Sequence, residues 1–260
     1  MSTLRFAAAL AATNLRAALA LRGAFWMQVV FMFLNNLIFF SFWWLAFQRI
    51  EHVGGWRLPE LCALYGLVAG AFGASVVFLG GLRDLARAVV DGELDVWLTQ
   101  PKPVLLQAAA GRCQASGFGD MASAVLLLWW SGYLAGWGWV LAPLAMLCGA
   151  LVLAATTALI HSVAFWAGPM EGLARQATEW VVTTTVYPAS IYSGTVRFLM
   201  FVVLPSAFVS QLPVELLRDF SWPVAGGVVL GTAAYVALAL AVFARGLRVY
   251  TSGNRFVQRA

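Results

Sequence analysis

Long runs of apolar residues, separated by short polar intervals, dominate the chain. The runs cover residues 24–47, 61–82, 118–137, 140–166, 178–192 and 223–244. A helix needs about 20 predominantly apolar residues to cross the hydrocarbon layer of a bilayer, so the pattern predicts six membrane-spanning helices. A further apolar stretch, residues 198–209, is too short to cross and contains Pro205, which predicts a re-entrant or interfacial element.

Composition agrees with a membrane protein and excludes a water-soluble domain. Of the 260 residues, 62% are hydrophobic and only 10% are charged, and the mean hydropathy is +0.83. One soluble core cannot bury so large an apolar fraction. The first long run is longer than the apolar part of a cleavable signal peptide, so we expect it to be retained as a span. We therefore expect an all-α fold and treat residues 1–260 as a single transmembrane domain.

The N-terminal polar stretch predicts a helix that lies on the membrane surface. Between residues 4 and 21, apolar positions alternate with Arg5, Asn14 and Arg16. This segment is too polar to span a bilayer and is suited to its interface. We assign residues 1–22 to an interfacial helix; a simple cytoplasmic extension of the first span is the alternative.

Basic residues predict the orientation of the spans. Positively charged residues near span ends are retained in the cytoplasm. If the N-terminus is inside, twelve basic residues are cytoplasmic and four are outside, whereas the inverted topology reverses these numbers. The net charge of +5 thus belongs to span ends and does not indicate nucleic-acid binding. Both termini are expected in the cytoplasm, and the preference for arginine over lysine is typical of a GC-rich bacterial genome, which suggests a bacterial inner membrane. The expected cytoplasmic residues are Arg5, Arg16, Arg22, Arg83, Arg87, Lys102, Arg112, Arg175, Arg245, Arg248, Arg255 and Arg259, and the outer ones are Arg49, Arg57, Arg197 and Arg218.

The longest polar interval, residues 82–107, predicts a short amphipathic helix on the cytoplasmic side. Apolar positions from Leu82 to Val90 recur at three-and-four spacing, charged residues occupy the other side, and Gly92 is a natural stop. Such a helix suits docking on a soluble partner, but a solvated connector is equally compatible. A metal or catalytic site is disfavoured, because His52 and His161 are both distant in sequence. The docking candidates are Arg83, Asp84, Arg87, Asp91, Gly92, Glu93 and Asp95.

Polar residues inside the spans are candidates for a transport pathway. Polar groups in hydrocarbon tend to face a bundle interior or a cavity. Hydrogen bonding between helices remains the alternative for the Asn and Thr residues. Pro188, Pro205 and Pro213 break the interval between the fifth and sixth spans into pieces too short to cross. This predicts that residues 193–222 form either a cover over the outer end of a cavity or a rigid cap. The pathway candidates are Asn35, Asn36, Glu179, Thr183, Thr184 and Tyr187.

The chain lacks the motifs of an ATPase or a familiar enzyme. It contains no G-x-x-x-x-G-K-[ST] loop, no G-x-S-x-G elbow and no H-E-x-x-H site, and its one lysine, Lys102, lies between two prolines. Cys62, Cys113 and Cys148 show no metal-site or disulfide spacing. We therefore expect no enzyme activity, cofactor or metal in this chain. If ATP drives the protein, another subunit must bind it.

Four sequence stretches resemble a known family. GELDVWLTQPKP (92–103), YPASIY (187–192), VLPSAFVSQLP (203–213) and RGLRVYTSGN (245–254) occur in the order seen in permease subunits of bacterial ABC transporters of the type 2 exporter class. The likeness is to the small six-span permeases that are encoded separately from their ATPase. It extends nearly end to end, although Gln100 stands where that family often has arginine.

The resemblance implies an ATP-driven exporter. It implies a dimer of permease chains, identical or related, seated on two ATPase subunits that bind ATP and Mg. It also implies that the N-terminal helix and residues 82–91 touch the ATPase and that the segment near Pro205 forms re-entrant outer helices. From the residues alone, an ATP-independent channel or secondary carrier remains the alternative function. A membrane enzyme that uses Glu93 and Asp95 is a third, and the cargo is left open.

Overall fold

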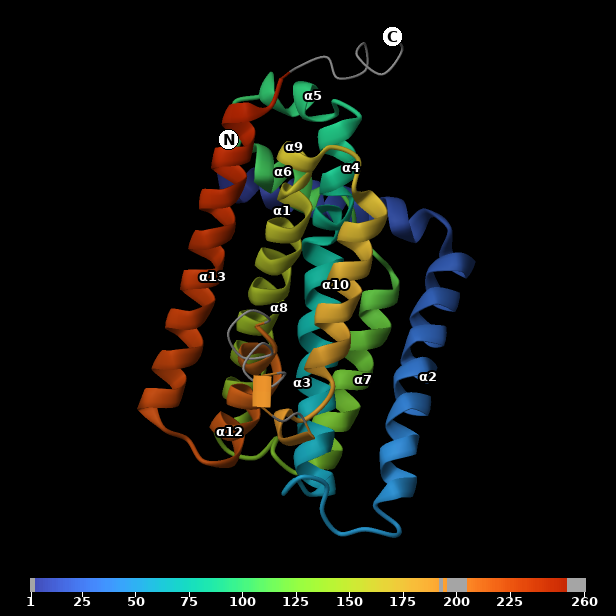
Figure 1. The fold of residues 1–260 in the computed structure, drawn as a ribbon. Helices are drawn as coiled ribbons and strands as arrows, with labels where there is room; N and C mark the ends of the chain where they lie inside the picture. The colour runs from blue at the N-terminus through green and yellow to red at the C-terminus, as the bar shows by residue number, and fades with distance from the viewer. Residues whose placement is uncertain (1–2, 192–193, 196–204, 252–260) are drawn as a thin grey trace.

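Six long helices run up and down in one bundle in the computed structural model, which describes residues 3–191, 194–195 and 205–251 (Figure 1). Within that part of the chain the structure is helical and has no strand, apart from an isolated bridge between Val53 and Trp56. This confirms the predicted all-α class. The long helices are α2 (Arg22–Ala46), α3 (Leu58–Phe78), α7 (Ser116–Ser131), α8 (Gly138–Ser162), α10 (Glu171–Thr185) and α13 (Trp222–Val249).

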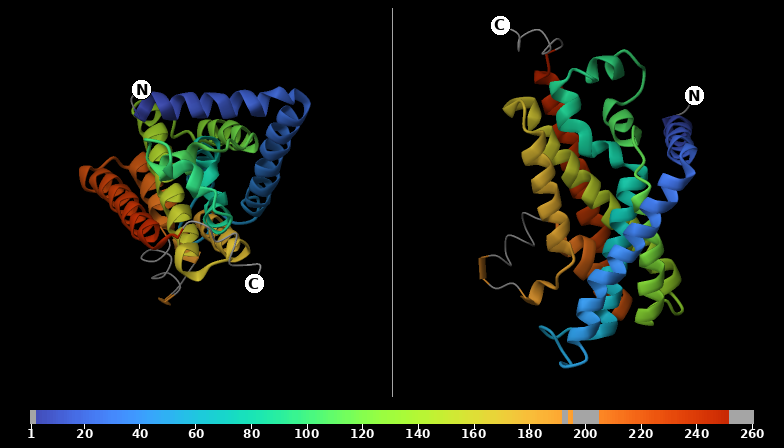
Figure 2. Two further views of the ribbon diagram at one scale, coloured as in Figure 1. Left: turned by 90° about the horizontal axis from the view of Figure 1, so that it is seen from above. Right: turned by 90° about the vertical axis from the view of Figure 1, so that its right-hand side faces the viewer.

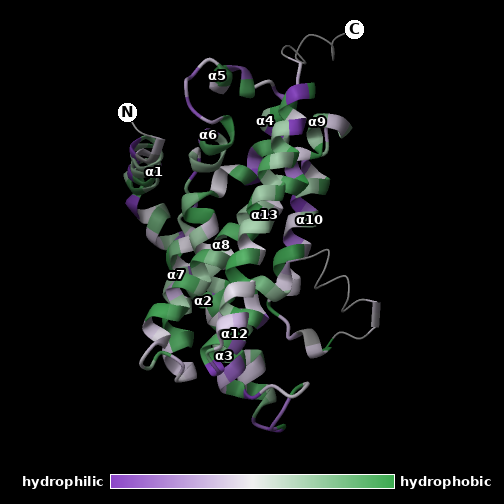
Figure 3. Ribbon diagram, turned by 90° about the vertical axis from the view of Figure 1, so that its left-hand side faces the viewer, coloured by the Kyte–Doolittle hydropathy of each residue, from purple (hydrophilic) through white to green (hydrophobic). Residues whose placement is uncertain are grey.

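Short elements gather at one end of this bundle, which we call the connector end (Figure 1). They are α1 (Thr3–Ala20), η1 (Gly80–Asp84), α4 (Leu85–Val90), α5 (Leu94–Leu98), α6 (Val104–Ala110) and α9 (Ala164–Ala167). The opposite, far end carries η2 (Ala189–Ile191) and α12 (Leu212–Arg218), with η3 (Ala207–Gln211) beside α12. Hydrophobic residues cover the length of the bundle and hydrophilic ones concentrate toward its two ends (Figure 3). This distribution is the one that a bilayer requires.

Four of the six predicted spans are long and apolar enough to cross a membrane. They are Arg22–Ala46, Leu58–Phe78, Gly138–Ala167 and Trp222–Val249. Helices α7 and α10 run beside them but have 16 and 15 residues. At 1.5 Å per residue they reach about 24 Å and 23 Å, short of a hydrocarbon layer of about 30 Å. The chain is thus a multi-pass membrane protein, and length and composition establish four of its spans.

The fifth apolar run does not coincide with its helix. The sequence predicted a span over 178–192, whereas α10 begins at Glu171 and ends at Thr185. Glu171 and Arg175 form an ion pair at i,i+4 spacing that supports the first turn of the helix in the polar interval. Pro188 ends the helical run early, because the residue before a proline is restricted to extended conformations.

Helix α3 is the centre of the bundle. Of its most apolar window 72% is buried, against 6% for α2. Gly73 of α3 and Gly117 of α7 bring these two backbones together, since a Cβ on Gly73 would lie 2.5 Å from the carbonyl oxygen of Gly117. Small residues permit such close approach between helices in membranes. The packing of α7 on α3 therefore leaves no room for a side chain at this point.

The predicted N-terminal helix is present as α1 and crosses the connector end of the bundle (Figure 2). Asn14 donates a hydrogen bond to the carbonyl of Ala110 at the end of α6. The Lys102 ammonium lies 5.7 Å from the ring centroid of Phe6. α1 is therefore attached to the same connectors that follow α3.

Only part of the predicted outer segment 193–222 can be compared with the structure. Residues 196–204, which hold most of the apolar stretch 198–209, lie outside the described residues. The chain from residue 205 on forms η3, a π-helical turn, and α12, with Pro213 in the first turn of α12, where its missing N–H is tolerated. Arg218 lies 3.5 Å from Glu60, which ties α12 to the start of α3.

Candidate functional site

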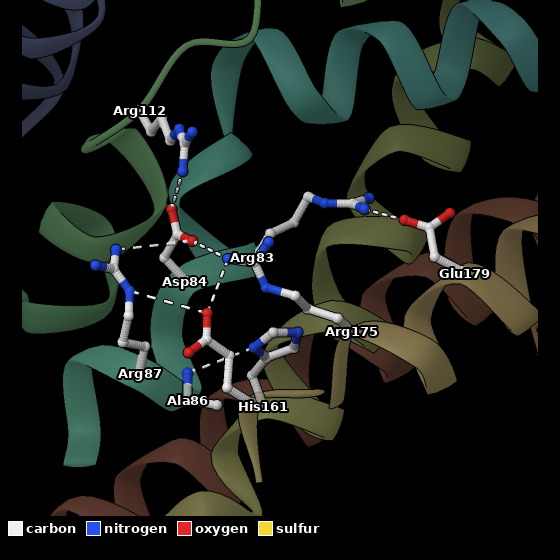
Figure 4. A network of polar contacts seen from close by, with 9 residues as sticks. Arg83, Asp84, Ala86, Arg87, Arg112, His161, Arg175 and Glu179 are labelled. Atoms are coloured by element: carbon white, nitrogen blue, oxygen red, sulfur yellow. Dashed lines mark hydrogen bonds and ion pairs between the residues drawn. The ribbon is translucent and has the colours of Figure 1, made fainter. Parts of the chain in front are cut away.

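The carboxylate of Asp84 is the centre of a polar cluster at the connector end (Figure 4). Arg112 donates to its Oδ2 at 2.7 Å and Arg175 donates to its Oδ1 at 2.7 Å. The Asp84 side chain is only 14% exposed, whereas those of Arg112 and Arg175 are 57% and 48% exposed. Each carboxylate oxygen thus holds one guanidinium from a different part of the chain.

Further ion pairs extend this arrangement along α10. Arg87 lies 3.8 Å from Asp84 and 4.0 Å from Glu171, and Arg175 also pairs with Glu171 at 2.9 Å. Arg83 pairs with Glu179, two turns further along α10. Networks of several charges contribute more to the stability of the fold than isolated surface ion pairs do. We call this set the connector cluster: Arg83, Asp84, Arg87, Arg112, Glu171, Arg175 and Glu179.

A side chain of α8 holds the start of α4 in place. Leu85, Ala86 and Val89 are buried, as the amphipathic pattern predicted, and α4 has no side-chain cap of its own. The N–H of Ala86, one of the first donors of the helix, lies 3.4 Å from Nδ1 of His161, which is completely buried. An accepting Nδ1 requires the neutral imidazole with its proton on Nε2. His161 thus supplies the cap that the local sequence lacks.

A glycine ends α4 and turns the chain into α5. Gly92 has φ +74°, and the N–H of Glu93 donates to the carbonyl of Ala88 at 3.0 Å, which is the Schellman arrangement. This confirms the predicted stop. Beyond it, Leu94 is buried and Asp95 accepts a hydrogen bond of 2.9 Å from the hydroxyl of Tyr250, so α5 is held against the end of α13.

The seven docking candidates do not share one outward face. Arg83 and Asp84 turn toward α10 and lie inside the connector cluster. Arg87 is 43% exposed but also contacts that cluster. Asp91, Gly92, Glu93 and Asp95 are half-buried around the turn between α4 and α5.

The most exposed apolar side chains of the segment belong to α5. Val96 is 62% exposed and Leu98 is 47% exposed. The sequence prediction did not single out these two residues. Their spacing of two within a five-residue helix carries no amphipathic signal, so only the structure reveals them.

Three of the pathway candidates lie on one exposed face of α10. Glu179 and Thr183 follow Gln176 at helical spacing, and all three are exposed. Tyr187 continues this line just beyond the helix, and its ring centroid lies 6.4 Å from that of Trp43 on α2. We call Gln176, Glu179 and Thr183 the α10 stripe. The sequence prediction missed Gln176, although it lies seven residues before Thr183 and so two helical turns from it.

The remaining pathway candidates lie elsewhere. Thr184 is buried on a different side of α10, where its hydroxyl donates to the carbonyl of Val181 at 2.7 Å. Asn35 is exposed on α2, with its amide 3.9 Å from the sulfur of Met32. Asn36 points into the bundle and donates to Asp120 at 2.7 Å. The structure therefore brings three candidates together and separates the other three.

The described residues offer no group of metal ligands. No set of three His, Cys, Asp or Glu side chains is placed to hold an ion anywhere in the described ranges. Cys62, Cys113 and Cys148 are separate free thiols, and burial raises the pKa of the Cys113 thiol, which makes it a poorer nucleophile. A small pocket of about 10 Å³, lined in part by Ser75, Arg83 and Thr178, has room for one water molecule.

Comparison with known proteins identifies the family. Residues 32–254 match the family described as ABC-2 family transporter protein. Neither the curated proteins nor the solved structures contain a significant match. The matched range begins within α2 and runs beyond α13, so it includes the connector cluster and the α10 stripe. Since it covers most of the sequence, the chain belongs to the ABC-2 family of transporter proteins, as its four sequence motifs predicted.

Proposed function

We propose that this chain is the transmembrane permease subunit of an ATP-driven exporter. It forms a substrate pathway with a second permease chain, and separate ABC ATPase subunits bind ATP and Mg and drive it. Family membership supports the permease role. The sequence contains no phosphate-binding loop, so the nucleotide belongs to the partner. The distribution of basic residues supports a connector end in the cytoplasm, in a bacterial inner membrane. The six long helices that run along the bundle, α7 and α10 included, support six crossings.

We call residues 79–115, between α3 and α7, the connector segment. Its attachment to α10 is the observation that carries this proposal. Asp84 and Arg87 lie on the segment between the second and third long helices, and both contact charged residues of α10. Arg83 adds a third link through Glu179, which belongs to the α10 stripe. A displacement of the connector segment is therefore passed to the helix that carries the pathway candidates.

Helix α5 is the proposed docking surface for the ATPase. Val96 and Leu98 are exposed at the connector end, and α5 lies at the extreme of that end, beyond the apolar length of the bundle (Figures 1 and 3). Apolar side chains exposed to water at that position are stabilised when the groove of a partner protein buries them. Buried Leu94 and the Asp95–Tyr250 hydrogen bond hold α5 in place, so it acts as a rigid contact.

The α10 stripe is the proposed wall of the pathway. Polar side chains exposed on a membrane helix are costly in lipid, so they face water or another protein chain. Gln176, Glu179 and Thr183 are such side chains. A second permease placed against this side encloses them.

Co-purification with a co-expressed ABC ATPase tests the docking surface. The double variant Val96→Asp, Leu98→Asp is expected to lose the ATPase, because two carboxylates replace the apolar contact. The matched control is Ile50→Asp, a 44% exposed apolar residue in the loop at the far end, which should retain it. Unchanged ATPase stoichiometry in the double variant contradicts docking through α5. Transport by the purified chain alone in liposomes, without ATPase, contradicts the ATP-driven function and favours a channel or carrier.

A further inference from the structure

A buried carboxyl group lies between α2 and α7, apart from the connector cluster and the α10 stripe. Asp120 of α7 is 3% exposed. Its Oδ1 accepts a hydrogen bond of 2.7 Å from the Asn36 amide, which also donates to the Ser123 hydroxyl at 2.9 Å. The second oxygen, Oδ2, is buried and has no hydrogen-bond partner among the described residues. Both N–H bonds of the Asn36 amide are therefore directed into α7.

No described positive charge compensates this carboxyl group. Asp120 takes part in none of the ion pairs within the described ranges. On α2 the one charged residue is Arg22, fourteen positions before Asn36 and so about 21 Å along the helix. On α3 the titratable groups are Glu60, Cys62 and Tyr65. Each is at least eight positions, about 12 Å, from Gly73, the α3 residue that packs on the Asp120 Cβ.

The ionised and the protonated forms of Asp120 differ in which group is left without a partner. An ionised carboxylate here is an unpaired charge in a non-polar environment, the least favourable arrangement for a buried group. A protonated carboxyl group keeps Oδ1 as the acceptor for Asn36 and leaves one O–H on Oδ2 without a described partner. An unpaired neutral donor is far less costly than an unpaired charge. The geometry therefore favours the neutral acid.

We propose that Asp120 is a proton-binding site inside the membrane, whose neutral carboxyl group joins α7 to α2 through Asn36. Helix α2 is otherwise the least buried of the candidate spans, and α7 is its principal neighbour. The site remains protonated only while α2 covers it. A movement of α2 away from α7 removes the Asn36 amide, admits water to the carboxyl group and releases the proton.

Infrared spectroscopy of the purified chain in lipid nanodiscs at neutral pH tests the protonation state. The wild type is expected to show the C=O stretching band of a protonated carboxylic acid, and Asp120→Asn should lose it. The control Asp219→Asn, whose side chain is 85% exposed at the far end, should keep it. Absence of the band in the wild type, or its full retention in Asp120→Asn, overturns the proposal.

A second measurement avoids any folding defect of the variant. Carbon-13 placed at the side-chain carboxyl of aspartate in the unmodified chain should shift the band, and the same label in glutamate should leave it in place. A band that shifts with the glutamate label only also overturns the assignment.

Because the Asn side chain retains an acceptor oxygen, Asp120→Asn should keep its apparent melting temperature within about 2 °C of the wild type. A larger loss contradicts the role of the neutral group in joining α7 to α2.

Discussion

The carboxylate of Asp84 joins three parts of the chain that are far apart in sequence. It contacts Arg87 on its own segment, Arg112 after α6 and Arg175 on α10. Its low exposure distinguishes it from ordinary surface ion pairs, whose net contribution is small. Asp219 offers the contrast, since its side chain is 85% exposed and lies 3.6 Å from Arg218. The energetic weight of a carboxylate in this protein thus depends on burial and on the number of its partners.

The substitution Asp84→Asn should lower the free energy of unfolding by about 2 kcal/mol, because the negative charge and one of its two acceptor oxygens are lost beside the arginines that they compensate. The expected fall in apparent melting temperature in detergent is about 5 °C. Under the proposed function the variant still binds the ATPase but transports less per ATP hydrolysed. Asp219→Asn is the control and should match the wild type in both measurements. An Asp84→Asn protein that equals its control contradicts the assigned role of the connector cluster.

Helix α10 presents two different faces. Ala174, Thr178 and Val181 are buried against the bundle, whereas the α10 stripe is exposed. Beside the stripe, Leu173 and Trp180 are 68% and 65% exposed and apolar. Polar and apolar side chains on adjacent sides of one membrane helix face different surroundings. We expect the stripe to contact water and the apolar side to contact lipid.

Cysteine labelling distinguishes these two sides of α10. In a background without the three native cysteines, Gln176→Cys and Thr183→Cys should react with a water-soluble maleimide. Leu173→Cys and Trp180→Cys should react slowly, because lipid excludes the reagent and disfavours the thiolate. Equal rates at all four positions contradict a polar pathway along this helix. The rates are measured by mass spectrometry on protein in liposomes.

The whole molecule separates its basic residues between the two ends of the bundle. Arg83, Arg87, Arg112 and Arg175 belong to the connector cluster, while Arg218 lies at the far end beside the start of α3. Positive residues are retained in the cytoplasm, so the connector end is expected to face that side. The docking proposal requires this orientation, because the ATPase is cytoplasmic.

Impermeant labelling of intact cells tests the orientation. Glu51→Cys, in the exposed loop at the far end, should be labelled from outside. Gln100→Cys, exposed in the connector between α5 and α6, should be labelled only after the membrane is permeabilised. The opposite pattern places the connector end outside the cell and excludes contact with a cytoplasmic ATPase.

The sequence by itself determined the membrane class, the helical content and the Gly92 stop. These depend on the composition, spacing and local conformation of neighbouring residues, which act before any helix packs on another. The sequence also predicted the family through short motifs in a fixed order. The start of α10 was misplaced, because an apolar run locates the part of a helix in lipid and not the polar turn that precedes it.

The tertiary structure alone decided which polar side chains meet. Adjacent Asn35 and Asn36 point to opposite surroundings, one exposed and one bound to Asp120, because neighbouring residues on a helix project about 100° apart. Asp120 was absent from the predicted sites, although it is the single carboxylate in the run 118–137. Its partner depends on the rotation and register of α7, which close packing such as that of Gly117 on Gly73 sets. Helical periodicity identifies faces, but only packing between helices determines what each face contacts.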